Sequence, residues 1–253
     1  MSIFNWRAKK QLIFFLIVAF FVLAMIVGII YWNRPEATCF DNKQNQDEES
    51  VDCGGGCTPC VVNPKDVVTM WTRVFEVSDG VYEVASLIKN PNLFYGMPRL
   101  KYTFKIYDSV NVLVAIKEGQ TFLNPQDEFL IFETGIKTGK RDVAKAFVEI
   151  EPLSEWKYTE EEKLALVVSE KNFSNYPLPT MRARLFNESL FSVKDIAVTV
   201  VLYDKDENAI AVSSTNVDLI AGKSIRDVVF TWGEPLEVLP SSSKIFTRVN
   251  GEI

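Results

Sequence analysis

The feature that most constrains this chain is an uncharged, almost wholly apolar run from Leu12 to Trp32. A helix over this run is about 30 Å long at about 1.5 Å per residue, which matches the hydrocarbon core of a bilayer. The apolar region of a cleavable signal peptide spans about 7–15 residues, and no small-x-small cleavage site follows this run. We therefore expect an uncleaved transmembrane helix over residues 12–32, with residues 1–11 and 33–253 on opposite sides of the membrane.

The charges that flank the run predict its orientation. Arg7, Lys9 and Lys10 lie just before it, whereas only Arg34 and Lys43 lie close behind it. Because basic residues are enriched on the cytoplasmic side, we expect a cytoplasmic N-terminus and extracytoplasmic C-terminal domains in a single-pass protein of the cell membrane. The chain has 33 acidic against 27 basic residues, which argues against nucleic acid as a partner.

All the cysteines of the chain, Cys39, Cys53, Cys57 and Cys60, follow within one short segment. Four thiolates can hold a tetrahedral zinc ion, and Cys57-x-x-Cys60 is a suitable half-site. The predicted orientation instead puts them in an oxidising compartment, so we favour two disulfides over zinc. A redox-active Cys57-Thr-Pro-Cys60 is a third interpretation, but the sequence around it lacks the βαβ pattern that such a site needs. Four cysteines allow three pairings, and the sequence leaves the choice open.

The segment between Cys39 and Cys53 is acidic and contains almost no apolar residue. Its carboxylate and amide oxygens are ligands that calcium prefers, although their spacing does not follow the EF-hand register. The alternative is a solvated acidic loop held by disulfides. The candidate calcium ligands are Asp41, Asn45, Glu48 and Asp52.

This segment resembles a short module of secreted and surface proteins with the pattern C-x-D-G-x-x-N-x-x-E-x-x-x-D-C-G-G-x-C-x-x-C. Asn42 stands where the pattern has its first glycine, and asparagine also tolerates a left-handed backbone. The resemblance implies an extracellular spacer or small adhesive module over a linker of residues 33–63, and it names no ligand. The residues on pattern are Cys39, Asp41, Asn45, Glu48, Asp52, Cys53, Gly54, Gly55, Cys57 and Cys60.

From Pro64 onward the sequence changes to alternating apolar segments separated by short polar turns. Such segments at regular spacing are typical of antiparallel sandwiches rather than of βαβ units. The segment Glu151–Lys163, which is rich in glutamate, is the predicted junction between two domains. We expect an all-β fold: after the transmembrane helix, two tandem Ig-like antiparallel β-sandwiches over residues 64–155 and 156–253.

The two predicted sandwiches are related in sequence. The stretch from Tyr102 to Asp108 aligns with the stretch from Val198 to Asp204 at an offset of 96 residues. Asn90 and Asn187 correspond with a shift of one residue, as expected if insertions are confined to turns. In each stretch the residues two apart are predicted to face the core: Tyr102, Phe104 and Ile106, and Val198, Val200 and Leu202.

These repeated units resemble the FxLYD-type and late-embryogenesis-abundant-type β-sandwich families. The resemblance rests on the strand that ends in Tyr-Asp, the upstream asparagine and a later turn. It covers most of the C-terminal part and implies the fold more than any activity. The matching positions are Asn90, Tyr107, Asp108 and Leu123–Pro125, then Asn187, Tyr203, Asp204, Leu219–Gly222 and Phe230–Trp232.

Catalytic motifs are scarce. The chain has no histidine, which removes the commonest general base, and it has no P-loop, GxGxxG or G-x-S-x-G motif. The carboxylates of Asp204 and Asp206 and of Glu160–Glu162 are better explained as turn residues and a charged surface. Of all surface patches, Phe94 and Tyr95 are the best candidates for a contact with a partner, and the alternative is that they close the end of the sandwich.

We therefore expect a non-enzymatic protein of the cell envelope that works in binding, assembly or spacing. Its partner would be a protein or an envelope polymer, and no cofactor is implied apart from the calcium considered above. The alternative is an envelope hydrolase that uses clustered carboxylates or the bound calcium.

Overall fold

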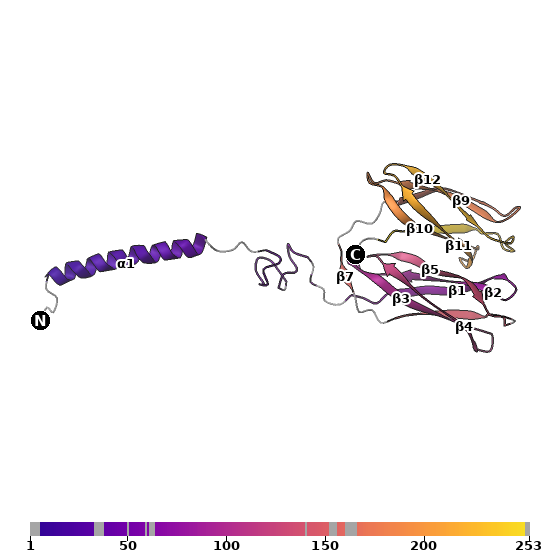
Figure 1. The fold of residues 1–253 in the computed structure, drawn as a ribbon, viewed down its shortest axis with the longest axis horizontal. Helices are drawn as coiled ribbons and strands as arrows, with labels where there is room; N and C mark the ends of the chain where they lie inside the picture. Colours follow the sequence, from indigo (N-terminus) through magenta and orange to yellow (C-terminus); the bar gives the residue numbers. More distant parts are fainter. Residues whose placement is uncertain are drawn as a thin grey trace. The chain divides into compact units, whose positions relative to one another are not determined.

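The computed structural model describes residues 6–32, 38–49, 51–58, 60, 64–139, 141–151, 156–159 and 166–250. The chain divides into two compact units, Met1–Val62 and Asn63–Ile253, which are described separately below. Strands dominate the second unit and a single long helix dominates the first (Figure 1).

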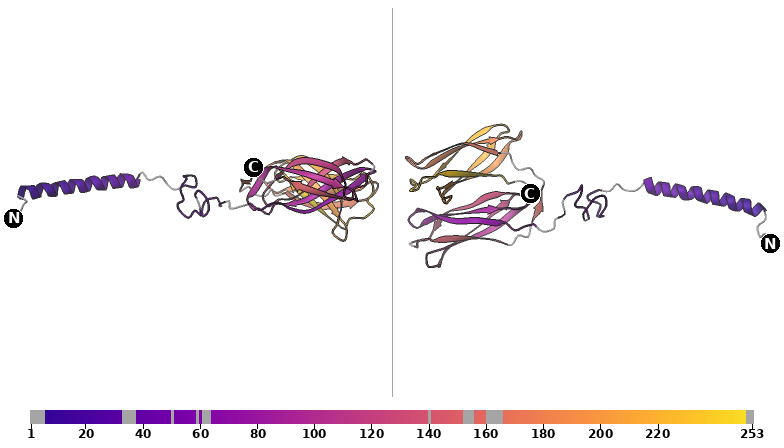
Figure 2. Two further views of the ribbon diagram at one scale, coloured as in Figure 1. Left: turned by 90° about the horizontal axis from the view of Figure 1, so that it is seen from below. Right: turned by 180° about the vertical axis from the view of Figure 1, so that it is seen from behind.

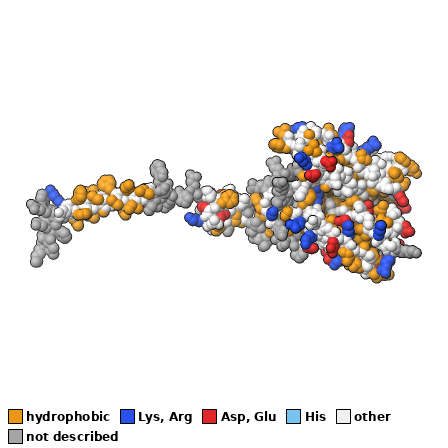
Figure 3. Space-filling model, in the orientation of Figure 1, with side chains coloured by type: hydrophobic (Ala, Val, Ile, Leu, Met, Phe, Trp, Pro, Cys, Tyr) orange, Lys and Arg blue, Asp and Glu red, His pale blue; other side chains and the backbone are white. Residues whose placement is uncertain are grey.

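The first unit begins with helix α1, Trp6–Trp32, whose described side chains are hydrophobic from Leu12 onward (Figure 3). Lys10–Ile29 is long enough to cross a membrane, with a mean hydropathy of 3.2 and no part of it buried in the protein. The helix starts before Leu12 because helical hydrogen bonding does not require apolar side chains. A signal sequence can have the same length and hydropathy, so the uncleaved anchor and its orientation stay predictions.

The cysteine segment that follows contains two disulfides. Cys39 is bonded to Cys57 and Cys53 to Cys60, with Cα atoms 5.6 and 4.9 Å apart. No free cysteine is left. The predicted disulfides are therefore confirmed, and the structure supplies the pairing that the sequence left open. Neither the zinc site nor a free dithiol is compatible with these bonds.

The second unit contains two antiparallel β-sandwiches, named sandwich 1 and sandwich 2. The all-β fold predicted from the sequence is confirmed. Sandwich 1 has the sheets β1-β2-β5 and β4-β3-β6, with β7 beside β3. Its strands are β1 (Val68–Ser78), β2 (Val81–Lys89), β3 (Tyr95–Tyr107), β4 (Leu113–Leu123), β5 (Glu128–Lys137), β6 (Lys145–Ile150) and β7 (Lys157–Tyr158).

Sandwich 2 has the sheets β12-β9-β8 and β11-β10-β13. Strands β8 to β13 therefore repeat, in the same order and with the same partners, the arrangement of β1 to β6. The strands are β8 (Leu166–Ser174), β9 (Thr180–Asn187), β10 (Val193–Tyr203), β11 (Ala209–Ile220), β12 (Ile225–Thr231) and β13 (Ser242–Arg248).

The cores lie where the alternation of apolar residues predicts them. Phe104 and Ile106 of β3 are fully buried in sandwich 1, and Val198, Val200 and Leu202 of β10 are fully buried in sandwich 2. These residues are two apart along their strands, so they share the inner face of their sheet. Period-two alternation is thus sufficient to identify both cores.

Two asparagines hold corresponding loops in the two sandwiches. The side-chain amide of Asn90 donates to the carbonyls of Tyr95 (2.7 Å) and Asn124 (2.8 Å). That of Asn187 donates to the carbonyl of Phe191 (2.7 Å) and, more weakly, to those of Ile220 and Ala221. Asparagine is suited to this position because its amide satisfies buried carbonyls that the strands leave unpaired.

The two sandwiches pack face to face, so that the unit has four layers of sheet (Figures 1 and 2). Sheet β1-β2-β5 of sandwich 1 packs on sheet β11-β10-β13 of sandwich 2. Both inner layers are therefore buried on both faces, which explains the consecutive buried residues Val84–Ile88 of β2 and Val200–Leu202 of β10. The contact is formed by Ala85, Leu87, Leu130, Val201, Ala209, Val212 and Phe246, flanked by Trp71, Phe75, Phe132 and Tyr203.

Candidate functional site

A cleft of about 1170 Å³ lies between the two sandwiches. One wall is β1 with the start of β2 and β6, and the other is β11 with the segment after β12. β1 and β11 are the edge strands of the two inner sheets, so the cleft opens where the interface ends. Clefts between domains are common ligand sites because two walls contribute side chains to one space.

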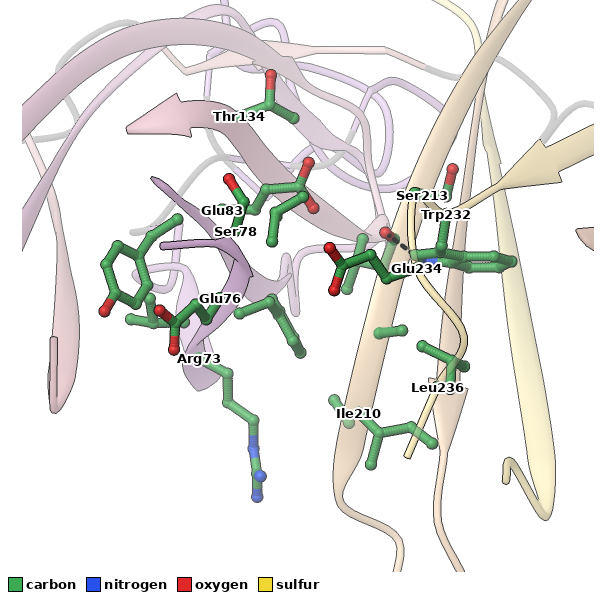
Figure 4. A pocket seen from close by; sticks show the side chains of 18 of the residues that line it. Arg73, Glu76, Ser78, Glu83, Thr134, Ile210, Ser213, Trp232, Glu234 and Leu236 are labelled. Atoms are coloured by element: carbon green, nitrogen blue, oxygen red, sulfur yellow. Dashed lines mark hydrogen bonds between the residues drawn. The ribbon is translucent and has the colours of Figure 1, made fainter. Parts of the chain in front are cut away.

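Acidic side chains dominate the charges that line this cleft. Sandwich 2 contributes Glu234 and Glu237, and Glu234 projects toward the wall that carries Glu76 and Glu83 (Figure 4). Carboxylates that face one another across a cleft repel, and a bound cation would relieve this repulsion. The acidic lining residues are Glu76, Asp79, Glu83, Glu234 and Glu237, and the basic ones are Arg73 and Lys145.

Glu83 is the most unusual of these carboxylates. Glu83 lies on β2 and is paired with Phe75 of β1. It is two residues from Ala85, so both lie on the face of the sheet that contacts sandwich 2. Burial raises the pKa of Glu83, which is half-buried and has neither a hydrogen-bond nor an ion-pair partner among the described residues. A desolvated carboxylate without a counter-charge costs folding free energy, which is typical of a group retained for binding.

Trp232 forms an aromatic wall of the cleft close to Glu234 (Figure 4). Its indole Nε1 donates to the carbonyl of Val212 at 2.9 Å, and its ring packs edge-on against Phe173. These contacts fix the ring before any ligand arrives. An aromatic face beside carboxylates can bind the methylene groups of an amine side chain while the carboxylates bind its charge.

One cation of the cleft is engaged in holding the two walls together. Arg73 Nη2 donates to Oδ1 of Asn208 at 2.8 Å, which links β1 to the turn before β11. The described lining residues include no histidine or cysteine, and the serines Ser78, Ser213 and Ser214 therefore have no histidine beside them.

The sequence-predicted contact residues Phe94 and Tyr95 do not line this cleft. They lie at the start of β3, where both rings contact Tyr158 of β7, with centroids 5.8 and 5.5 Å apart. Burial raises the pKa of Tyr95, and its hydroxyl has no hydrogen-bond partner in the described part of the chain. Both rings therefore pack on Tyr158, and their part in a partner contact stays a prediction.

The predicted calcium ligands lie together in the cysteine segment. Asp52 Oδ1 accepts from the backbone N–H groups of Asp41 and Asn42, both at 3.0 Å. Glu48 Oε2 accepts from the N–H of Asn45 at 3.0 Å, and the side chain of Asn45 donates to Asp41 Oδ2 at 2.7 Å. The carboxylates thus cap the backbone of the loop, and calcium binding stays a prediction.

A second metal-like grouping in this segment is explained by the disulfide. The sulfurs of Cys39 and Cys57 and a carboxylate oxygen of Glu48 lie within 4.8 Å of one another. The two sulfurs are bonded to each other, so neither is a thiolate ligand. The approach of Glu48 Oε1 to Cys57 Sγ at 3.3 Å is a contact only, because a disulfide sulfur has no hydrogen to donate.

The other predicted carboxylates are structural or lie outside the described residues. Asp204 Oδ1 accepts from the N–H groups of Asp206 and Asn208, both at 2.8 Å. Hydrogen bonds from Asn208 and Asp206 lower the pKa of Asp204. Asp108 caps the corresponding turn of sandwich 1 in the same way. Glu160–Glu162 lie outside the described residues.

The residues of the cleft were not predicted from the sequence. Glu83 interrupts the apolar residues of β2, between Tyr82 and Val84, and this interruption is the only local signal. Glu234 lies in an irregular segment that faces Glu83 only because the two sandwiches stack. The sequence signal for this stacking is that apolar residues, such as Ala85 of β2 and Val201 of β10, lie on the strand face that points away from the core of their own sandwich.

No protein-family model matches the chain, and no curated protein matches its sequence. Among solved structures, a crystal structure of red sea bream transglutaminase is similar, with a TM-score of 0.22 and 10% identity. The similarity covers 71% of this chain and 31% of that chain, so this chain spans less than a third of the transglutaminase. A likeness of this extent says nothing about activity.

Proposed function

We propose that this protein is a membrane-anchored, extracytoplasmic binding protein that recognises a cationic group in the cleft between its two sandwiches. Its apolar helix and its disulfides are consistent with a membrane-anchored extracellular protein. The observation that carries the proposal is Glu83, a half-buried carboxylate with no partner among the described residues, in a cleft lined by further carboxylates and Trp232. The role is binding rather than catalysis.

The ligand class follows from the charges. Primary amines and guanidinium groups combine a positive charge with hydrogen-bond donors, which carboxylates accept. Their alkyl stems suit the ring of Trp232. Lysine or arginine side chains of a protein, or amino groups of an envelope polymer, present this chemistry.

The cysteine segment would serve as a spacer between the membrane and the sandwiches. Its internal caps and its two disulfides support a stable module that needs little apolar core. Its resemblance to modules of secreted and surface proteins agrees with this role. The FxLYD-type resemblance likewise supports the duplication of the sandwiches, and the corresponding Asn90 and Asn187 strengthen it.

The experiment is a titration of the full chain in detergent with trilysine, followed by thermal unfolding and calorimetry. We expect saturable binding that weakens with salt, and an unfolding temperature that rises with ligand concentration. The variant Glu83→Gln/Glu234→Gln should lose at least about tenfold in affinity, equivalent to about 1.4 kcal/mol.

The matched control is Glu170→Gln/Glu188→Gln, which removes two carboxylates of sandwich 2 that do not line the cleft. This variant should bind trilysine as the wild type does. Equal losses of affinity in both variants would mean that net charge alone causes the effect, and would refute the cleft as the binding site. A spacer without a ligand would show no stability shift at any trilysine concentration.

A further inference from the structure

Sandwich 2 contains two tripeptides of the form Asn-x-Ser, which is the acceptor pattern for an N-linked glycan. Asn172–Ser174 lies on β8, and Asn187–Ser189 begins at the last residue of β9. A glycan is attached to the side-chain nitrogen of the asparagine, so this nitrogen has to be accessible. The surroundings of the two asparagines therefore decide which tripeptide can carry a glycan.

Asn187 is closed to this modification in the folded protein, because the residue is only 1% exposed. Its Nδ2 donates to the carbonyl of Phe191 at 2.7 Å and to those of Ile220 and Ala221, both at 3.2 Å. A glycan on this nitrogen would displace these hydrogen bonds and would not fit into the packed end of the sandwich. The role of Asn187 is therefore structural.

Asn172 is open to the modification. It is an exposed residue of β8, the last strand of sheet β12-β9-β8, and its side chain has no hydrogen-bond partner among the described residues. Phe173 packs into the core of sandwich 2 against Trp232, so its neighbours Asn172 and Ser174 point outward. Ser174 is also exposed, and its hydroxyl donates to the nearby carbonyl of Tyr176 at 3.0 Å. The amide and the hydroxyl of the tripeptide thus both face solvent.

The counterpart of Asn172 in sandwich 1 is Arg73. Asn172 pairs with Arg182, Arg73 pairs with Ala85, and Arg182 and Ala85 correspond at an offset of 97 residues. Arg73 lies on the face of its sheet that contacts sandwich 2, where it binds Asn208. Asn172 lies on the equivalent face of sandwich 2, which is the outer face of the molecule, so a glycan there has room in solvent.

We propose that Asn172 is an N-glycosylation site on the outer face of sandwich 2. A transferase joins the Asn172 Nδ2 to the anomeric carbon of a lipid-linked oligosaccharide. The bond between that carbon and the phosphate oxygen of the donor breaks, the lipid phosphate leaves with the electron pair, and Nδ2 gives one proton to a base of the transferase. Such transferases act outside the cytoplasm, so the inference rests on the extracytoplasmic placement in the proposed function. It does not rest on the cleft, which Asn172 does not line.

The experiment synthesises the full chain in the presence of endoplasmic-reticulum microsomes, which supply the transferase and the lipid-linked oligosaccharide. Peptide N-glycosidase in water labelled with heavy oxygen then converts each glycosylated asparagine into a labelled aspartate, which peptide mass spectrometry locates. In protease-resistant, folded protein we expect the label at position 172 and not at position 187. Asn172→Gln and Ser174→Ala should each abolish it, whereas the matched control Ser189→Ala, which removes the second acceptor pattern, should leave it unchanged.

A further variant separates failure of the site from failure of the extracytoplasmic placement. Leu113→Thr completes an acceptor pattern at Asn111, in an exposed turn of sandwich 1. Label at position 111 of this variant, with none at position 172, would refute the site and leave the placement intact. Label at neither position would refute the placement and the site with it. Label at position 187 of the folded protein, or label at position 172 that survives Ser174→Ala, would also overturn the proposal.

Discussion

At the scale of the residue, Arg248 makes the densest set of contacts between the two sandwiches. It belongs to β13, yet its Nε donates to Asp127 Oδ2 at 2.9 Å and its Nη1 to Thr121 Oγ1 at 3.1 Å, both in sandwich 1. Its guanidinium lies 4.0 Å from the ring centroid of Phe122 and 3.6 Å from that of Phe129. Burial lowers the pKa of Arg248, and the adjacent Asp127 opposes this effect.

Replacing Arg248 by methionine should destabilise the stacked sandwiches by about 3–5 kcal/mol, because it leaves the carboxylate of Asp127 buried without its partner. Urea unfolding followed by tryptophan fluorescence measures the change. The control Lys244→Met breaks the exposed ion pair with Glu128 and should cost at most about 1 kcal/mol. Similar losses in the two variants would refute a special role for the buried pair.

Glu83 should make the protein less stable at neutral pH than it would be with glutamine. Burial raises its pKa in the folded state above the ordinary value of 4.5, so ionisation favours unfolding once the pH exceeds the folded pKa. Glu83→Gln should therefore raise the urea midpoint at pH 7, and this gain should vanish as the pH falls to about 4. The exposed Glu76→Gln is the matched control, and a gain that persists at pH 4 would contradict the electrostatic origin.

At the scale of the element, two similar sandwiches join through faces that do not correspond. Sheet β1-β2-β5 of sandwich 1 contacts sheet β11-β10-β13 of sandwich 2, whereas the sheet that corresponds to β1-β2-β5 is β8-β9-β12. A head-to-tail contact of this kind can repeat without limit unless the free faces differ from the joined ones. The chain therefore needs a means of stopping the stack at two sandwiches.

Charged residues on the free faces provide that means. Leu87 and Leu130 of the joined face correspond, at an offset of 97, to Arg184 and Asp227, which form an ion pair on the outer face of sandwich 2. Likewise, Val201 and Phe246 of the joined face of sandwich 2 correspond to Lys105 and Glu149 of sandwich 1. Lys105 and Glu149 form an ion pair on the free outer face of sandwich 1. Desolvating these ion pairs opposes the addition of another sandwich.

Removing the charges from both free faces should therefore let separate molecules stack. We expect the combined variant Lys105→Val/Glu149→Phe/Arg184→Leu/Asp227→Leu to self-associate in detergent at micromolar concentration, as seen by sedimentation velocity. Each pair of substitutions alone should leave the molecule in the association state of the wild type, because stacking needs both faces. If one pair alone causes the same association, simple surface hydrophobicity is the cause.

At the scale of the whole molecule, the disulfides and the β-sheets belong to different compact units. Both disulfides lie within Cys39–Cys60, and the hydrophobic clusters of the sandwiches contain no cysteine. The stability of the sandwiches should therefore come from their own cores and from the contact between them.

Reduction of the disulfides should leave the unfolding of the sandwiches unchanged. We expect the free energy of unfolding, from urea titration followed by tryptophan fluorescence, to stay within about 0.3 kcal/mol of that of the oxidised protein, while a protease begins to cleave within residues 38–60. Mass spectrometry of the fragments locates the cuts. A large fall in the midpoint on reduction would mean that the cysteine segment supports the sandwiches.

Much of the fold could be predicted from the sequence, and little of the candidate site. Phe104 and Val200 were assigned correctly to the cores because period-two alternation is a local property. Phe94 is a predicted contact residue because it is apolar in a loop, and the contact of its ring with Tyr158 leaves that prediction open. Glu83 could not be predicted as a site residue, because a single carboxylate in an apolar strand is recognised as part of a cleft only when the opposite wall is known.

The long apolar helix, the disulfide-bonded segment and the two β-sandwiches follow from the amino-acid sequence, because hydropathy and strand alternation are properties of neighbouring residues. The cysteine pairing, the stacking of unlike faces and the acidic cleft are visible only in the folded molecule. These depend on residues far apart in the chain, such as Asp127 and Arg248, which are 121 positions apart. Packing brings such residues together, and no local pattern records which partner each of them meets.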